Sequence, residues 1–70
     1  MTNGEKVLRR CMSNVGISDW EELYEATGIN GLTFRRRRAD PSLWRRYEEL
    51  IIKNTLKMSD EDFLEWVKSE

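Results

Sequence analysis

Arginine is the residue type in this chain best suited to a chemical task, and six arginines lie within one short stretch. Four are consecutive at Arg35–Arg38, and two more follow at Arg45 and Arg46. A guanidinium group stays charged and can donate two parallel hydrogen bonds to a phosphate or to the edge of a guanine. The stretch therefore predicts a surface that binds anions.

The net charge of −1 conceals a very uneven distribution of charge. Residues 29–46 carry six arginines and one aspartate, net +5, whereas residues 1–28 are net −2 and residues 47–70 are net −4. A run of like charges is most often a solvated face, and exposed ion pairs contribute only about 0–1 kcal/mol each. Pairing inside the chain would therefore not remove an anion site. The glutamates available for such pairs are Glu21, Glu22, Glu25, Glu48 and Glu49.

The chain lacks the residues that a catalytic, metal or disulfide site would need. The chain has no histidine, the commonest metal ligand and general base, and its one cysteine, Cys11, cannot form an internal disulfide. We therefore expect no enzymatic activity, no metal or other cofactor, and no small-molecule substrate. No apolar run approaches the roughly 20 residues of a membrane helix, and the N-terminus lacks the apolar stretch of a signal peptide. These features predict a cytoplasmic protein that does not contact a membrane.

The spacing of apolar residues is helical throughout, which predicts an all-α fold, a compact five-helix bundle formed by one domain over residues 1–70. The first helix begins near Glu5 and ends at Gly16, and Cys11 lies on its apolar stripe as a small buried residue. Its other apolar members are Val7, Leu8, Met12 and Val15.

Capping signals predict where the next two helices begin and end. Ser18 and Glu21 have the spacing of a capping box, so we expect Ser18 to cap a second helix that ends at Gly28. Asn30 is the expected N-cap of a third helix over residues 32–38, which Asp40-Pro41 ends. The expected inner face of the second helix carries Trp20, Leu23 and Tyr24.

Two further helices complete the expected bundle. Ser42 is predicted to cap a fourth helix that runs to about Thr55, and Ser59 a fifth that reaches nearly to the C-terminus. We expect Leu43, Tyr47, Leu50 and Ile51 to face inward, with Trp44 at the edge of the core. In the fifth helix, the predicted apolar side is Phe63, Leu64, Trp66 and Val67. Little chain remains to cover Phe63 and Trp66, so we predict that they contribute to a dimer interface.

The segment 23–34 combines a helix, a tight turn at Gly28 and a second short helix, which is the spacing of a helix-turn-helix placed at about residues 19–38. The chain here resembles the Cro and lambda-repressor-like helix-turn-helix domains of phage repressors. The resemblance is carried by Trp20-Glu21-Glu22-Leu23, Thr27-Gly28-Ile29-Asn30, Leu32-Thr33-Phe34-Arg35-Arg36, Asp40-Pro41, Tyr47-Glu48-Glu49-Leu50-Ile51 and Met58-Ser59-Asp60-Glu61-Asp62-Phe63.

The resemblance implies a DNA-binding transcriptional regulator, a Cro-like repressor that binds double-stranded DNA as a dimer in the cytoplasm and nucleoid of a bacterial host. The second helix of the motif would enter the major groove. It further implies that Phe34 packs inward. The implied DNA-contacting residues are Asn30, Gly31, Leu32, Thr33, Arg35, Arg36, Arg38, Arg45 and Arg46.

Two positions depart from the pattern of this family. Tyr24 stands where the family usually has a small residue at the helix crossing, and Arg37 stands at an inward position that is usually apolar. Either the helix pair opens, or the third helix rotates, or Arg37 pairs with an acidic neighbour. The departures keep a second hypothesis open, in which the domain binds a protein, as a phage-encoded inhibitor or adaptor, and does not read DNA.

Overall fold

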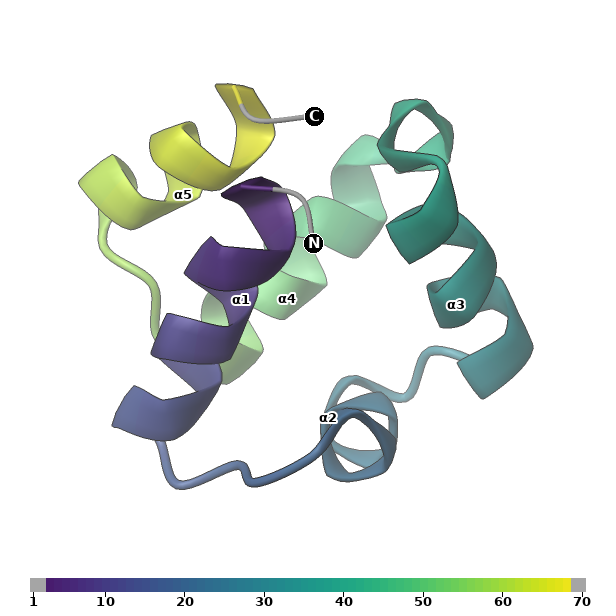
Figure 1. Cartoon of the computed structure of the whole chain (residues 1–70), viewed down its shortest axis with the longest axis horizontal. Coiled ribbons are helices and arrows are strands. Elements are labelled where there is room, and N and C mark those ends of the chain that lie inside the picture. Colours follow the sequence, from purple (N-terminus) through teal and green to yellow (C-terminus); the bar gives the residue numbers. More distant parts are fainter. Residues whose placement is uncertain (1–2, 69–70) are drawn as a thin grey trace.

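A computed structural model gives the fold and describes residues 3–68. These residues form five α-helices and one short 3-10 turn, with no strand among them (Figure 1). The all-α, five-helix prediction is therefore confirmed. The elements in chain order are α1 (Asn3–Asn14), α2 (Trp20–Thr27), α3 (Gly31–Ala39), η1 (Pro41–Leu43), α4 (Arg46–Leu56) and α5 (Asp60–Lys68).

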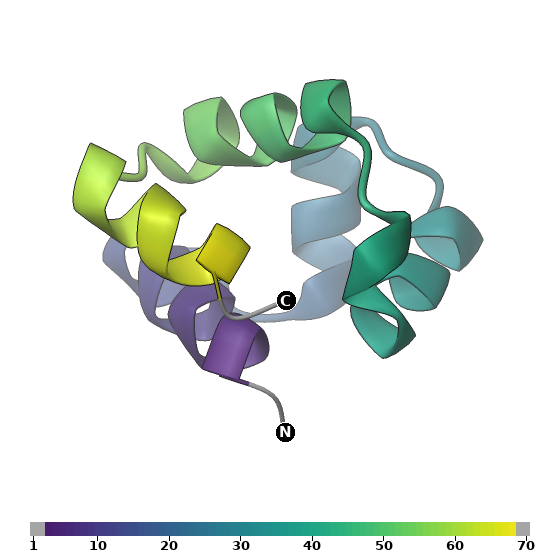
Figure 2. The same cartoon turned by 90° about the horizontal axis from the view of Figure 1, so that it is seen from above.

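The helix α4 joins the two halves of the molecule. It packs against both α1 and α2, while α1 also packs along α5 and α2 packs against α3. Figure 2 shows α4 crossing one side of the fold, with α1 and α5 beneath one end and α2 and α3 beneath the other. In residues 3–68, no helix has the length and apolar character needed to cross a bilayer.

The end of α1 follows from its sequence. The predicted stripe is buried from Val7 to Met12. Gly16 adopts a left-handed φ of 79°, and the N–H of Ile17 donates to the carbonyl of Met12 at 2.9 Å, so the chain turns back on the last turn of the helix.

The start of α2 differs from the prediction by one residue. Asp19, not Ser18, is the N-cap, and its carboxylate accepts a hydrogen bond from the N–H of Glu22 at 2.8 Å. The Glu22 carboxylate in turn accepts from the N–H of Ser18 at 3.0 Å. Asp19 takes the cap because its backbone is extended, with φ at −144°, as an N-cap requires.

Aromatic rings form a continuous path through the core. Neighbouring ring centroids lie 4.7–6.3 Å apart, and Phe34, near the middle, is fully buried. The rings of Trp20 and Tyr24 each contact Phe34. From Phe34 the path continues through Trp44 and Trp66 to Phe63. Trp66 is 1% exposed and Phe63 is 8% exposed. The core of the same chain therefore covers both residues predicted to lie at a dimer interface, and they present little surface to a second copy.

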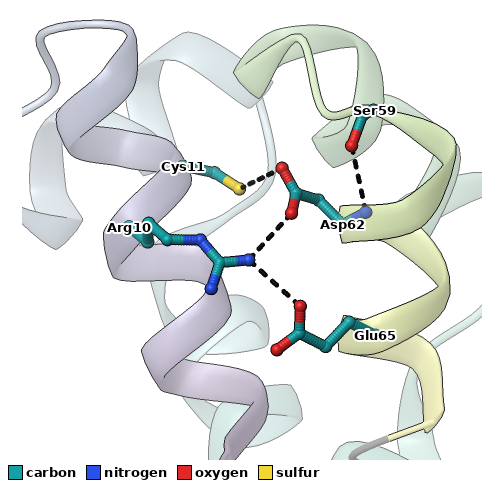
Figure 3. A network of polar contacts seen from close by, with 5 residues as sticks. All are labelled: Arg10, Cys11, Ser59, Asp62 and Glu65. Carbon is teal, nitrogen blue, oxygen red and sulfur yellow. Dashed lines mark hydrogen bonds and ion pairs between the residues drawn. The ribbon is translucent and has the colours of Figure 1, made fainter.

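A polar network fastens α5 to α1 (Figure 3). One nitrogen of Arg10 contacts the carboxylates of Asp62 at 2.8 Å and Glu65 at 3.2 Å. The second oxygen of Asp62 faces the thiol of Cys11 at 3.8 Å, and the Asp62 N–H donates to the hydroxyl of Ser59 at 3.1 Å. Ser59 thus caps α5 as predicted, and Cys11 is buried as predicted.

The fourth helix departs most from the prediction. It begins at Arg46, and the Ser42 hydroxyl instead donates to Asp40 at 2.6 Å, within the turn that contains η1. Ile51 is only half-buried. The buried residues of α4 are Glu48, Glu49, Ile52 and Leu56, whereas Leu43, Tyr47 and Leu50 are exposed. The inward face predicted for this helix is wrong. The side of α4 that faces the core carries Glu48, whose buried carboxylate pairs with Arg37.

Candidate functional site

The third helix presents one solvent-facing side, which we call the outer face of α3 and define as Leu32, Arg35, Arg36 and Ala39. The four residues recur at a spacing of three and four, so they lie on one side of the helix. Phe34 is buried as predicted and fixes which side faces water. The outer face of α3 therefore combines two cations with two apolar side chains.

The N-cap of α3 is the residue expected from the sequence. The side-chain oxygen of Asn30 accepts hydrogen bonds from the N–H groups of Leu32, at 2.9 Å, and Thr33, at 3.4 Å. Thr33 itself is half-buried. The Asn30 oxygen is thus engaged by its own helix, so its amide N–H₂ group is what it offers to a ligand.

Arg35 and Arg36 are both exposed, and neither takes part in an ion pair within residues 3–68. The Nε of Arg35 donates to the carbonyl of Gly31 at 3.4 Å, and its two terminal nitrogens form no ion pair among residues 3–68. These two guanidinium groups are available to an external anion.

Arg37 points into the fold and pairs with Glu48, one of the outcomes expected for this position. Its Nε lies 3.1 Å from a Glu48 oxygen, and the two side chains are 17% and 4% exposed. The same oxygen accepts the backbone N–H of Arg45 at 2.9 Å. Glu48 thus holds the second half of α3 beside the start of α4.

Arg38, a predicted DNA contact, points inward, and its side chain is only 19% exposed. Its guanidinium lies 3.8 Å from the centre of the Trp20 ring and donates to the hydroxyl of Tyr24 at 3.0 Å. A third contact joins it to Glu5 at 3.9 Å. Arg38 therefore links three helices, and the periodicity of α3 explains why, because residues 34, 37 and 38 share one side.

Gly31 explains how Tyr24 fits at the crossing of α2 and α3. A β-carbon at Gly31 would come within 3.2 Å of the Tyr24 ring. The small residue required by the crossing lies on α3 in this chain. The tyrosine is therefore buried, and Gly31 lies beneath it, which leaves little of Gly31 for a ligand.

Arg45 and Arg46 lie at the start of α4 and are exposed. The bond between Glu48 and the Arg45 backbone sets this end of α4 beside α3, so the structure brings four exposed arginines to adjoining segments. The four are Arg35, Arg36, Arg45 and Arg46.

Two carboxylates lie near the N-terminus of α3. Glu21 and Glu25 are exposed on α2, and together with Asn30 and Gly31 they line a shallow hollow at the start of α3. From the sequence, Glu21 and Glu25 were expected only as possible ion-pair partners of arginine, together with three other glutamates. Of these five glutamates, only Glu48 pairs with an arginine among residues 3–68.

The sequence matches no family model, no curated protein and no solved structure.

Proposed function

We propose that this protein is a sequence-specific DNA-binding transcriptional regulator of the Cro type, in which α2, the turn at Gly28 and α3 act as a helix-turn-helix. The observation that supports it most is the outer face of α3. There, Arg35 and Arg36 lie one helical turn from Leu32, exposed and outside every ion pair of residues 3–68.

In this proposal the exposed arginines contact two different parts of the DNA, the bases and the phosphates. Arg35 and Arg36 enter the major groove, where a guanidinium can donate to both acceptors of guanine, and Leu32 contacts a thymine methyl group. Arg45 and Arg46 contact the phosphates that flank the groove. Arg38 has no part in DNA binding because its guanidinium is engaged with Trp20 and Tyr24. We further propose that the regulator acts as a dimer, with a contact that does not involve Phe63 or Trp66.

The proposal is tested by fluorescence anisotropy with a random-sequence duplex across a salt series. Affinity should fall steeply with salt, since each neutralised phosphate adds about 0.9 to the slope of log K against log salt. Arg45→Ala and Arg46→Ala should each weaken binding and lower that slope by about one, because they remove phosphate contacts. Arg35→Ala and Arg36→Ala should each weaken binding with a smaller change in the slope, because they remove contacts with bases. Lys6→Ala removes an equal charge from an exposed position on α1 and serves as the control.

Selection from a random duplex library then tests base reading. We expect a preferred sequence from the parent protein and a relaxed preference from at least one of the two arginine variants. Absence of binding at low salt, or equal loss with Lys6→Ala, would contradict the proposal.

One observation favours a second function, an interaction module that binds another protein and does not read DNA. Glu21 and Glu25 face solvent at the start of α3, where a DNA backbone would meet their charges. If α3 binds DNA, Glu21→Gln and Glu25→Gln should raise duplex affinity by relieving like-charge repulsion. If the parent and both variants fail to bind duplex DNA at low salt, the second function is favoured.

A further inference from the structure

An apolar surface lies on the solvent side of α4. Leu43, Tyr47 and Leu50 are 46%, 59% and 44% exposed, and the half-buried Ile51 adjoins Tyr47 and Leu50 on the helix. We call Tyr47, Leu50 and Ile51, with Leu43 of the preceding turn, the α4 stripe. The other exposed large apolar residues of the described chain, Leu32 and Leu64, stand singly on other helices. Single exposed apolar residues are normal, whereas a group of them indicates a binding surface.

The α4 stripe exists because the helix buries its acids. Glu48 accepts from Arg37 and from the backbone of Arg45, so the acidic positions of α4 turn inward and Tyr47 and Leu50 turn outward. An ordinary surface helix keeps its charged residues exposed, whereas α4 buries two glutamates beside Ile52 and Leu56. The cost of exposing these apolar side chains is offset if a partner covers them.

The polar residues that accompany the stripe on α4 are neutral or basic. Arg46 and Asn54 are exposed on the helix, and Lys57 follows at its end, whereas both glutamates of α4 are buried. The exposed side of α4 is therefore apolar and cationic, with no exposed carboxylate. Its complement is a surface that combines apolar side chains with acidic ones.

From this pairing of charge and apolar area we propose that the α4 stripe is the docking site for an acidic amphipathic helix of another protein. The partner helix lays leucine-type side chains against Tyr47 and Leu50, and its carboxylates reach Arg46 and Lys57. The docking site shares Arg46 with the proposed phosphate contacts but otherwise lies on a different helix from the outer face of α3. It thus adds a protein-binding function to the proposed DNA-binding one and does not depend on it.

A second copy of the chain is a poorer occupant of the same surface. A symmetric pair through α4 would bring each stripe against itself, so that Arg46 and Lys57 would meet cations of like sign. The exposed acidic side of α5 offers a second copy only Leu64 as a large apolar contact, between Glu61 and Glu65. A membrane is also poorly matched, because only two helical turns carry the stripe.

The test uses a designed, fluorescently labelled helical peptide of about 20 residues, long enough to form a stable helix. Leucines recur on one side at helical spacing and glutamates fill the other. A second peptide replaces each glutamate with lysine. We expect the glutamate peptide to bind in a salt-sensitive way, and the lysine peptide to bind at least about ten-fold more weakly.

Two matched variants locate the binding. Leu50→Asp should weaken the glutamate peptide at least about ten-fold, since it places a charge at the centre of the contact. Leu64→Asp makes the same change at a residue of similar exposure, 52% against 44%, on α5 and should leave binding unchanged. Circular dichroism of both variants verifies that they remain folded.

Several outcomes would overturn the inference. One is equal binding of both peptides, and another is equal loss with Leu50→Asp and Leu64→Asp. A third is a parent protein that sediments as a dimer which Leu50→Asp dissociates, since this assigns the stripe to a second copy. A fourth is stripe-dependent binding to phosphatidylserine vesicles without binding of the glutamate peptide.

Discussion

The ring of Tyr24 lies over the backbone of Gly31, so that a β-carbon at position 31 would come within 3.2 Å of Tyr24 Cδ2. The same ring lies 4.7 Å from that of Phe34, which prevents it from simply moving away. The large side chain of Tyr24 on α2 fits because Gly31 on α3 has no side chain. These two residues together set how closely α2 and α3 approach.

The first prediction is that Tyr24 and Gly31 are energetically coupled. Gly31→Val should lower the free energy of unfolding by about 1–3 kcal/mol in the parent, because the added methyl groups overpack the crossing. In a Tyr24→Ala background, Gly31→Val should lower the free energy of unfolding by less. The two decreases should differ by at least about 0.5 kcal/mol, which is the coupling energy of the pair. Urea unfolding of the four proteins measures this. Ala39→Val on the exposed side of α3 measures how much a valine lowers the free energy of unfolding in this helix without contact with Tyr24. If the effects of Gly31→Val and Tyr24→Ala simply add in the double variant, the two residues are not coupled.

The second prediction concerns the buried pair of Arg37 and Glu48. Arg37→Met leaves the Glu48 carboxylate, 4% exposed, without its cation, and should lower the free energy of unfolding by roughly 3 kcal/mol. Replacing both residues with methionine should restore part of that loss, because no buried charge then remains.

Chemical denaturation measures these changes, and Lys53→Met provides the control. It breaks the exposed pair between Lys53 and Asp60, whose side chain is 90% exposed, and should cost little. If Arg37→Met proved no more destabilising than Lys53→Met, Glu48 would not depend on its cation.

The third prediction separates two arginines that are close in sequence. Arg38→Met should lower the free energy of unfolding by about 1–3 kcal/mol, because it removes the contact with the Trp20 ring and the hydrogen bond to Tyr24. Arg36→Met should change it by no more than about 0.5 kcal/mol, because the side chain is exposed, yet it should weaken duplex binding. Thermal unfolding and anisotropy, run on both variants, test the assignment. The opposite pattern would show that the two arginines have exchanged roles.

The fourth prediction is a pH dependence that arises from Cys11. Burial, and then the neighbouring Asp62 carboxylate, raise the pKa of the Cys11 thiol above its ordinary value of 9.0. The folded state therefore favours the neutral thiol. Its contribution to stability is complete below the pKa of the thiol in the unfolded chain and is lost as the pH rises through the folded pKa.

Thiolate absorbance of the folded protein should accordingly appear at higher pH than that of the unfolded protein. Cys11→Ala should remove this part of the alkaline loss of stability, which urea unfolding at a series of pH values measures. Titration of Cys11 at the unfolded pKa would contradict the prediction.

Local signals in the sequence predicted most helix ends. Gly16 and Gly28 end their helices with a left-handed backbone, and Asn30 and Ser59 cap the helices that follow them. Each of these features involves residues within one or two turns of each other, so spacing alone reveals it. The burial of Phe34 followed in the same way from its place at the helix crossing.

Other features were decided only by tertiary structure. Hydropathy predicted that Tyr47 and Leu50 face inward, yet Glu48 is buried in their place because Arg37, eleven positions earlier in the sequence, supplies its cation. Trp66 is buried because Trp44, from a distant turn, packs against it. The sequence by itself therefore determined the number of helices and most of their ends, whereas tertiary contacts decided which faces of α3 and α4 remain for a ligand. The physical reason is that the free energy of burying a charge depends on a partner that spacing along one helix does not reveal.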